Sequence, residues 1–205
     1  DAFGGVYLPW YRDGKKNWYL DEYGSNRNWY GKTERLLEND EYFCGGNCCF
    51  RRSLLIKLGG FPENMGMKGS EIRYGEEDYI QELARSNGAN LGFVPSLIIH
   101  HYTSLKKQTV SWLLLSAWYS GKAYWNMPST PVSFRHLVYL QCVFIPYAFL
   151  NLLRSINNTS TTYKVCHVFL SVMLNFSKQL SRSFYGFKVM TLLLWKKVIN
   201  SIGYS

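Results

Sequence analysis

Hydrophobic and polar positions change their pattern twice along the chain. A short apolar run at residues 6–8, followed by Pro9, predicts a strand that ends at the proline. Residues 11–41 are polar and interrupted by glycines, which predicts a long structured loop. Beyond them the apolar positions become periodic, and after residue 105 the period is that of helices.

Two helices and one strand are expected between residues 50 and 101. Ser53 is a suitable cap for a short helix over 54–58, which Gly59 and Gly60 would end. A second helix is expected over 76–86 with Gly88 as its stop, and its apolar stripe consists of Tyr79, Ile80, Leu83 and Ala84. Residues 91–94 and 97–99 predict a strand that Pro95 interrupts with a bulge or an edge, ending at His100-His101. Glycines keep the segment before 76 loose, as expected of a loop that approaches a ligand.

Four helices are expected in the second half, over 110–124, 136–153, 163–180 and 187–199. Residues 136–153 contain no Lys, Arg, Asp or Glu. This uncharged run of 18 residues is close to the minimum length for crossing a bilayer. Pro146, Gln141 and Asn151 interrupt this apolar run. We therefore expect a helix that lies in the membrane interface, with Phe144, Tyr147 and Phe149 in the lipid, and a single spanning helix is the alternative.

Charge divides the chain into two bodies. Residues 1–100 hold 12 Lys and Arg and 14 Asp and Glu, so 12 − 14 = −2, whereas residues 101–205 hold 11 Lys and Arg and no acid, which gives +11. We expect a mixed α/β region over 1–105 and a helical, membrane-apposed region over 106–205. A basic, acid-free and aromatic segment suits an anionic membrane surface. Nucleic acid is not expected as a partner, because single cations separated by long apolar runs cannot follow a phosphate backbone.

Composition narrows the class further. A chain with 47% hydrophobic and 18% charged residues is neither disordered nor fibrous. The five cysteines, without a secretory signal near Asp1, predict reduced thiols and a location at the cytoplasmic face of a membrane. Cys44, Cys48 and Cys49 with His100 and His101 suggest a zinc site, but the usual pair-of-pairs spacing is missing, and small buried thiols are the alternative.

Three carboxylates, Glu76, Glu77 and Asp78, open the helix expected over 76–86. Acids in a first helical turn interact favourably with the helix dipole, so the cluster is explained by capping alone. A carboxylate held there is also suited to accept a proton from a hydroxyl. A glycosidase would need its two acids on opposite sides of a sugar, which neighbours in one turn cannot supply unless Glu63 or Glu71 joins them.

An ordered series of short motifs surrounds these carboxylates. Along residues 42–101 the chain reads Gly45-Gly46-Asn47, Phe50-Arg51-Arg52, Gly59-Gly60-Phe61-Pro62-Glu63, Gly75-Glu76-Glu77-Asp78, Gly88, Val94-Pro95 and Ile99-His100. In order and spacing this series resembles the second half of the catalytic domain of glycosyltransferase family 2. The resemblance implies an α/β fold that is a partial GT-A domain, doubly wound, with a nucleotide sugar bound at the carboxyl ends of its strands.

The resemblance also implies roles for individual residues. Asp78 would be the general base of an inverting transfer, with Glu77 as the alternative. Gly45, Gly46 and Asn47 would form a turn beside the donor or acceptor sugar, with Glu76 also in the substrate site. Arg51 and Arg52 would contact diphosphate. His100 would contact the metal or the diphosphate.

The expected activity is transfer of a sugar from a nucleotide-sugar donor to a saccharide or lipid-linked acceptor, in the synthesis of a cell-surface polysaccharide or glycan. The family's uridine-binding strand and its Asp-x-Asp motif would precede Asp1. We therefore expect the chain to be part of a longer protein, whose divalent metal, Mg or Mn, has its main ligands outside these residues. A non-catalytic membrane-docking remnant or scaffold is the alternative.

Overall fold

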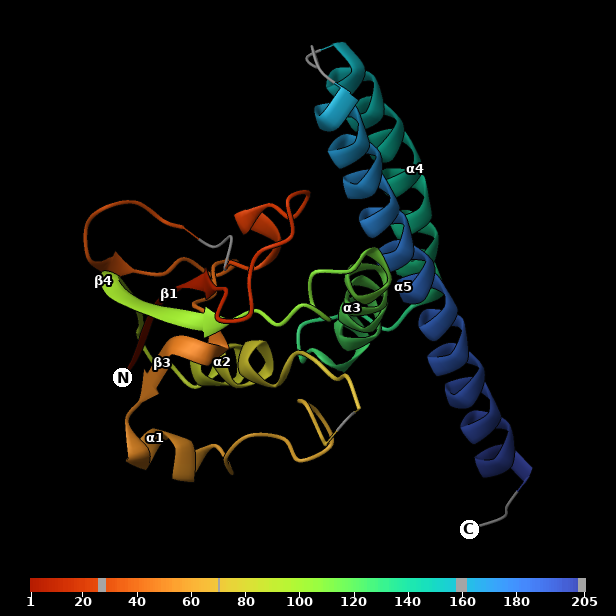
Figure 1. Cartoon of the computed structure of the whole chain (residues 1–205). Coiled ribbons are helices and arrows are strands. Elements are labelled where there is room, and N and C mark those ends of the chain that lie inside the picture. Colours follow the sequence, from red (N-terminus) through yellow and green to blue (C-terminus); the bar gives the residue numbers. More distant parts are fainter. Residues whose placement is uncertain (26–28, 70, 158–161, 203–205) are drawn as a thin grey trace. The chain divides into compact units, whose positions relative to one another are not determined.

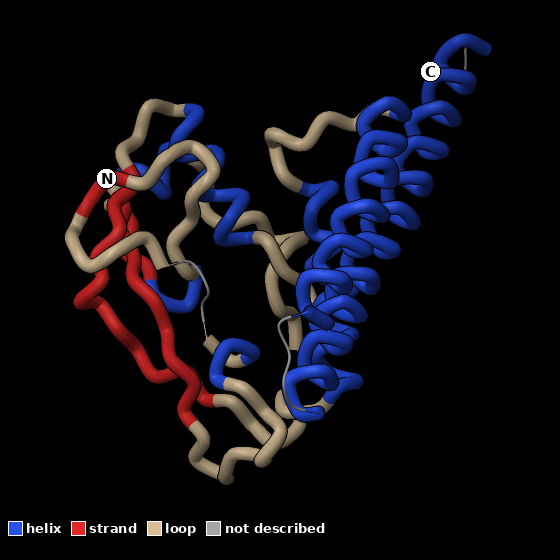
Figure 2. Tube along the Cα trace, turned by 90° about the horizontal axis from the view of Figure 1, so that it is seen from above, coloured by secondary structure: helices blue, strands red, loops and turns tan. Residues whose placement is uncertain are grey.

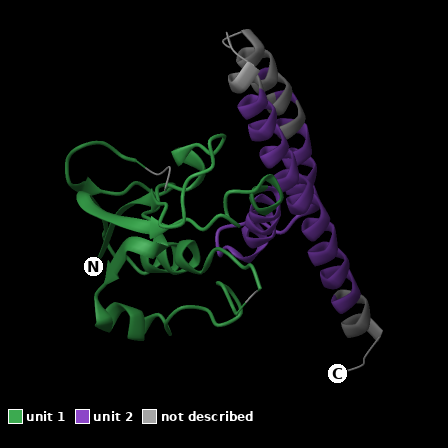
Figure 3. Ribbon diagram, in the orientation of Figure 1, with its two compact units in different colours: residues 1–113 green, residues 114–205 purple. Residues whose placement is uncertain are grey.

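The computed structural model describes residues 1–25, 29–69, 71–157 and 162–202. The chain divides into two compact units, Asp1–Leu113 and Leu114–Ser205, and the division falls within helix α3 (Val110–Ala123) (Figure 3). The first unit combines a sheet with helices, and the second is helical in its described part. The expectation of a mixed α/β chain is confirmed.

A mixed sheet forms the centre of the first unit. In the described part of the chain it has four strands, β1 (Ala2–Trp10), β2 (Arg35–Leu36), β3 (Cys48–Phe50) and β4 (Leu91–Tyr102), in the order β2-β4-β1-β3 (Figure 1). β1 and β4 are parallel, and the two short edge strands are antiparallel to their neighbours. Gly4 pairs with Phe93 but Val6 pairs with Ile98, so extra residues of β4 bulge out around Pro95. The predicted bulge is confirmed, although β4 continues past His101 to Tyr102.

Strand β1 does not end at Pro9, so that prediction was wrong. The carbonyl of Trp10 accepts a hydrogen bond from Thr103 N–H, on the β4 side. Because alternate residues of a strand bond to the same neighbour, the backbone of Pro9 faces the other side. There the pairing with β3 involves only Ala2, Phe3 and Gly4. The missing N–H of Pro9 therefore breaks no ladder bond.

The core of the first unit lies at the start of the parallel strands. Its buried residues Ala2, Phe43, Ala84 and Leu91 are joined by partly buried neighbours, among them Leu54 and Leu58. These two leucines belong to helix α1 (Arg52–Lys57) and the turn that ends it. The predicted cap was wrong, since Arg51 is the N-cap and makes no side-chain cap bond. Arg51 N–H instead bonds Asp1 O at 2.8 Å, which holds the chain extended up to the helix.

Helix α2 (Glu76–Ser86) has the bounds that the sequence predicts. Its buried residues are Ile80, Ala84 and the polar Gln81. Only a tight turn separates Ser86 from Leu91, so α2 runs opposite to β4. The amino end of α2 therefore lies toward the carboxyl ends of β1 and β4. Between β1 and α2 the chain is mainly loop, with single turns η1 (Asp21–Tyr23) and η2 (Gly45–Asn47).

The second unit contains most of α3, the turn η3 (Tyr124–Asn126), α4 (Phe134–Asn157) and α5 (Thr162–Ile202). Helices α4 and α5 lie side by side over much of their length (Figures 1 and 2). The prediction of two helices over 163–180 and 187–199 was wrong, because α5 is continuous through both. The side chains of Phe144, Tyr147 and Phe149, which we expected in lipid, lie outside the described residues.

Neighbouring elements pack closely against α5 in and beside residues 181–186, the interval between the two helices expected from the sequence. A Cβ on Gly121 of α3 would lie 2.2 Å from Lys178 O, and a Cβ on Gly186 would lie 2.5 Å from Trp125 Cζ2. Trp125 Nε1–H also donates to Arg182 O at 2.6 Å. Small residues here allow close helix packing, so they mark an interior segment of α5. Within the described residues, no helix combines the length and apolar content that crossing a bilayer requires.

Candidate functional site

The three carboxylates that the sequence singles out stand together at the amino end of α2. The residue before them, Gly75, has φ of 97° and caps the helix without a side-chain hydrogen bond. Glycine adopts this left-handed conformation without strain, and the acids then occupy the first turn. Ligands of open α/β sheets bind outside the carboxyl ends of parallel strands, and this turn lies at that end of the sheet.

Glu77 is a carboxylate of this group whose pKa is shifted. Its side chain lies directly on Gly45, where a Cβ would come within 1.9 Å of Glu77 Cγ. Burial raises the pKa of the Glu77 carboxyl from 4.5 to about 7, and the charges of Glu76 and Asp78 act in the same direction. At neutral pH this carboxyl therefore exchanges a proton readily. Asp78, the next residue, is exposed.

The Glu76 side chain packs against a different segment, the loop that precedes α2. A Cβ on Gly66 would lie 2.7 Å from Glu76 Cδ, and the φ of Gly66 is 75°. Glu76 Oε2 is buried and has no hydrogen-bond partner within the described residues. Gly66, in the loop before α2, therefore lies against Glu76, and Gly45 of η2 lies against Glu77.

Gln81 connects α2 to the segment that carries Gly45. The residue is fully buried. Its Oε1 accepts a hydrogen bond from Phe43 N–H at 3.0 Å, and its Nε2 donates to Phe43 O and to Glu77 O, both at 3.1 Å. One side chain therefore satisfies both backbone groups of Phe43. This arrangement positions Cys44 and Gly45 beside Glu77.

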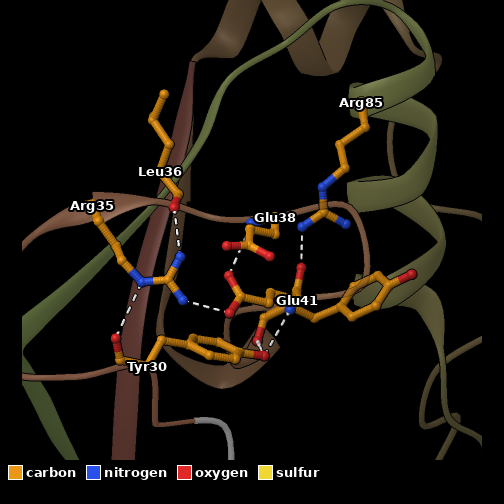
Figure 4. Close-up of polar contacts among 7 residues, drawn as sticks. Tyr30, Arg35, Leu36, Glu38, Glu41 and Arg85 are labelled. Carbon is orange, nitrogen blue, oxygen red and sulfur yellow. Dashed lines mark hydrogen bonds and ion pairs between the residues drawn. The ribbon is translucent and has the colours of Figure 1, made fainter.

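A polar network holds the chain just before Phe43 (Figure 4). The Arg35 guanidinium donates to the Glu41 carboxylate and to Tyr30 O, the latter at 3.1 Å, while Arg85 of α2 donates to Glu41 O. Tyr42 N–H in turn donates to the Tyr30 hydroxyl at 2.9 Å. The hydrogen bond from Arg35 lowers the pKa of the Glu41 carboxyl, so the network is intact at neutral pH. It fixes the approach of this loop to α2.

Tyr7 lies near the carboxylates, and His101 lies against Tyr7. Burial raises the pKa of the Tyr7 hydroxyl to about 12, and its neighbours Cys44, Tyr74 and Glu77 raise it further. The Tyr7 ring lies 4.9 Å from that of His101, measured between centroids. Burial lowers the pKa of His101, so its imidazole is neutral at pH 7. Strands β1 and β4 therefore contribute a neutral hydroxyl and a neutral imidazole to this edge of the site.

The predicted glycine turn is present as η2. Asn47 is buried there, and its Nδ2 donates to Val6 O and to Leu97 O, both at 2.8 Å. Both donors of this amide are therefore used within the protein, where they join η2 to β1 and β4 beside the bulge. Gly45 lies against Glu77, and Gly46 is exposed.

Arg51, Arg52 and His100 are not brought to the carboxylates. Arg51 and Arg52 follow β3, whose last residue pairs with Ala2 at the beginning of β1, so they lie toward the opposite end of the sheet. His100 adjoins His101 in an extended strand, so the two side chains point to opposite faces. Since His101 contacts Tyr7, His100 lies on the face away from it.

No group of three or more His, Cys, Asp and Glu side chains in the described part of the chain is arranged to hold a metal ion. Burial raises the pKa of the Cys44 and Cys48 thiols to about 11, so both remain protonated at neutral pH. The described residues therefore offer no ligand set for the zinc ion considered from the sequence, and the main ligands of the divalent cation are expected outside them. We therefore assign no chemical step to a metal here.

Four residues of the site were missed by the sequence analysis, namely Tyr7, Gly66, Gln81 and His101. The signal for Gln81 was a polar residue among the apolar positions of a helix. Gly66 was recognised only as part of a loose loop and Tyr7 only as a strand residue, while His101 was considered only as a strand end and a zinc ligand.

Comparisons of the chain with protein-family models, with curated proteins and with solved structures find no match.

The raised pKa of Glu77 predicts a pH-dependent stability. Because the folded protein holds this proton more tightly than the unfolded chain, the stabilisation is complete below pH 4.5 and is lost as pH rises through about 7. After a discount for partial exposure, we expect a loss of about 2 kcal/mol in the free energy of unfolding. Urea denaturation between these pH values measures it.

Glu77→Gln is the control, since the amide cannot titrate. The difference in unfolding free energy between wild type and variant should change across this pH range, while His101 titrates in both proteins and cancels. A difference that stays constant with pH contradicts the assignment.

Proposed function

We propose that this chain carries the acceptor-activating half of an inverting glycosyltransferase. The observation that carries the proposal is the pair Glu77 and Asp78, which stands at the amino end of α2, toward the carboxyl ends of the parallel strands. One carboxyl is partly buried with a pKa of about 7, and its neighbour is exposed. The ordered motifs along residues 42–101 support the same reading.

The proposed reaction uses one carboxylate as general base. It takes the proton of an acceptor hydroxyl while the hydroxyl oxygen forms a bond to the anomeric carbon of the donor sugar. The bond from that carbon to the diphosphate oxygen breaks, and the nucleoside diphosphate leaves with the electron pair. Attack opposite the leaving group inverts the anomeric centre.

We assign the base to Asp78, because it is exposed and can reach an acceptor. Glu77 is the alternative, because its pKa lies close to the operating pH. Gly45 and Gly66 make room for the side chains of Glu77 and Glu76, because a Cβ at either glycine would clash with them. Tyr7 lies near Glu77 as a neutral hydroxyl, and the neutral imidazole of His101 lies against Tyr7. Arg51, Arg52 and His100 have no part in this proposal, because they lie elsewhere on the sheet.

We further propose that the reaction takes place at the cytoplasmic face of a membrane. The acceptor is then a saccharide or a lipid-linked glycan of a cell-surface polymer. Support comes from the eleven cations of residues 101–205, which no acid offsets.

The test uses the protein as its gene encodes it, including any residues outside 1–205. It is incubated with a panel of nucleoside-diphosphate sugars, Mg²⁺ or Mn²⁺, and membrane lipid extract as acceptor. We expect release of nucleoside diphosphate that depends on the acceptor. Hydrolysis of a glycoside without nucleotide would indicate a glycosidase instead. Absence of both donor binding and release would overturn the proposal and favour a non-catalytic membrane-docking role.

A further inference from the structure

Helix α5 presents an apolar stripe to solvent. Six large side chains follow one another at intervals of three or four residues, so they share one face of the helix. Each is between 38% and 59% exposed. At 1.5 Å per residue the stripe extends for about 27 Å. It consists of Phe169, Met173, Phe176, Leu180, Phe184 and Phe187.

The stripe is more than one-third exposed along its length, although Phe184 also contacts Trp118 of α3, with the ring centroids 6.2 Å apart. Other packing contacts of α5 use small side chains. Ser177 Oγ donates to Leu114 O at 3.0 Å, Ser181 is buried beside Gly121, and Gly186 lies against Trp125. All six large side chains keep at least 38% of their surface exposed, and large exposed apolar patches mark interaction surfaces.

The positive charge of the second unit indicates what kind of partner the stripe binds. Of the eleven cations in residues 101–205, all but Lys106 and Lys107 belong to the second unit, which leaves nine, and its sequence contains no Asp or Glu. Arg135, Lys188 and Lys196 are exposed. A second copy that paired through the same face would bring its own second unit, with nine more cations and no Asp or Glu, so like charges would oppose this pairing. An anionic bilayer offers hydrocarbon to the stripe and phosphate or carboxylate groups to the cations.

We propose that α5 docks on an anionic bilayer through this stripe, with the helix lying along the interface and its cations among the headgroups. The inference rests on the part of the proposed function that places the chain at a membrane, and it does not require sugar transfer. It assigns the docking surface to α5, whereas the sequence suggested residues 136–153.

The experiment is flotation of the protein with vesicles of phosphatidylcholine containing a minority of phosphatidylserine, without donor or acceptor. The test variant carries Phe176→Ser, Leu180→Ser and Phe184→Ser. The control variant carries three equivalent changes at exposed apolar residues of the first unit, Leu36→Ser, Ile56→Ser and Met67→Ser. We expect the test variant to lose about 100-fold in vesicle partitioning, because three apolar side chains no longer enter hydrocarbon. The control variant should stay within about twofold of wild type, because its three changed side chains lie outside the stripe and do not enter hydrocarbon.

A second variant tests the charges without altering the stripe. Lys188→Glu with Lys196→Glu should weaken binding to the anionic vesicles but not to pure phosphatidylcholine. Salt should reproduce this loss only in part, because screening acts on the cations and not on the apolar contacts. Circular dichroism of each variant establishes that α5 remains helical. If the serine variant is unfolded, the loss of vesicle binding in the charge variant tests the proposal instead.

Three outcomes would overturn the inference. The first is wild-type protein that does not float with anionic vesicles, and the second is a serine variant that floats as well as wild type. The third is a concentration-dependent dimer in sedimentation that the serine variant abolishes, which would identify a second copy as the occupant. A failed transfer assay leaves this result untouched, because vesicle binding is measured without sugar.

Discussion

Asp78→Asn is expected to lower kcat for sugar transfer by about 10³-fold, since removal of a general base typically costs 10² to 10⁴ in rate. Asparagine has nearly the shape of aspartate but cannot take the proton of the acceptor hydroxyl. The affinity for the nucleotide sugar should change little, because the base acts in the transition state and not on the bound donor. Steady-state kinetics of the encoded protein, together with donor titration, measure both quantities.

Glu77→Gln separates the two carboxylates. If Asp78 is the base, this variant should keep a measurable rate and show a changed pH profile, because the neighbouring carboxyl with a pKa of about 7 is gone. If Asp78→Asn retains nearly normal turnover and Glu77→Gln does not, Glu77 is the base. Glu63→Gln, at an exposed position outside α2, is the matched control. Full activity in both test variants would show that the carboxylates of α2 do not carry the chemistry.

Gln81→Leu is expected to lower the free energy of unfolding by about 3 to 4 kcal/mol, since each unsatisfied buried backbone group costs about 1 to 3 kcal/mol. Leucine has a similar volume, so little of the loss comes from a cavity. The loss arises because Phe43 N–H and Phe43 O keep their burial but lose their partners on Gln81. Urea denaturation of wild type and variant at one pH measures the change.

Asn87→Leu is the control for this substitution. Asn87 is an exposed amide that also bonds a backbone carbonyl of α2, Leu83 O at 2.9 Å. Because water replaces that bond, we expect a change within about 0.5 kcal/mol. Equal effects at the two positions would mean that the paired bonds to Phe43 contribute nothing beyond those of a surface amide.

The elements that the sequence predicted well are those whose signals are local. Gly75, the three acids and Gly88 bracket α2, and the structure has the same bounds. Pro95 within an apolar run predicted the bulge of β4. Helix ends and strand interruptions depend on backbone conformation and on hydrogen bonds within a few residues. Such features can be read from neighbours in the chain.

Other features were decided by residues far apart in the sequence. Pro9 stays within β1 because β3 pairs only with the beginning of that strand. The small residues near Gly186 do not interrupt α5, because Trp125 and Leu137 pack against them. Arg51 and Arg52 lie away from the carboxylates because β3 runs antiparallel to β1. His101, rather than His100, lies against Tyr7.

The sequence by itself determined which residues carry the candidate chemistry, since the carboxylates of α2 and the glycines of η2 were named from it. Only the tertiary structure decided how these residues differ from one another. Glu77 acquires a pKa of about 7 because Gly45, more than thirty residues away, admits its side chain to a partly buried position. Gln81 holds that glycine in place through Phe43, 38 residues earlier. Desolvation and hydrogen bonding depend on what surrounds an atom in space, and local sequence patterns do not specify those surroundings.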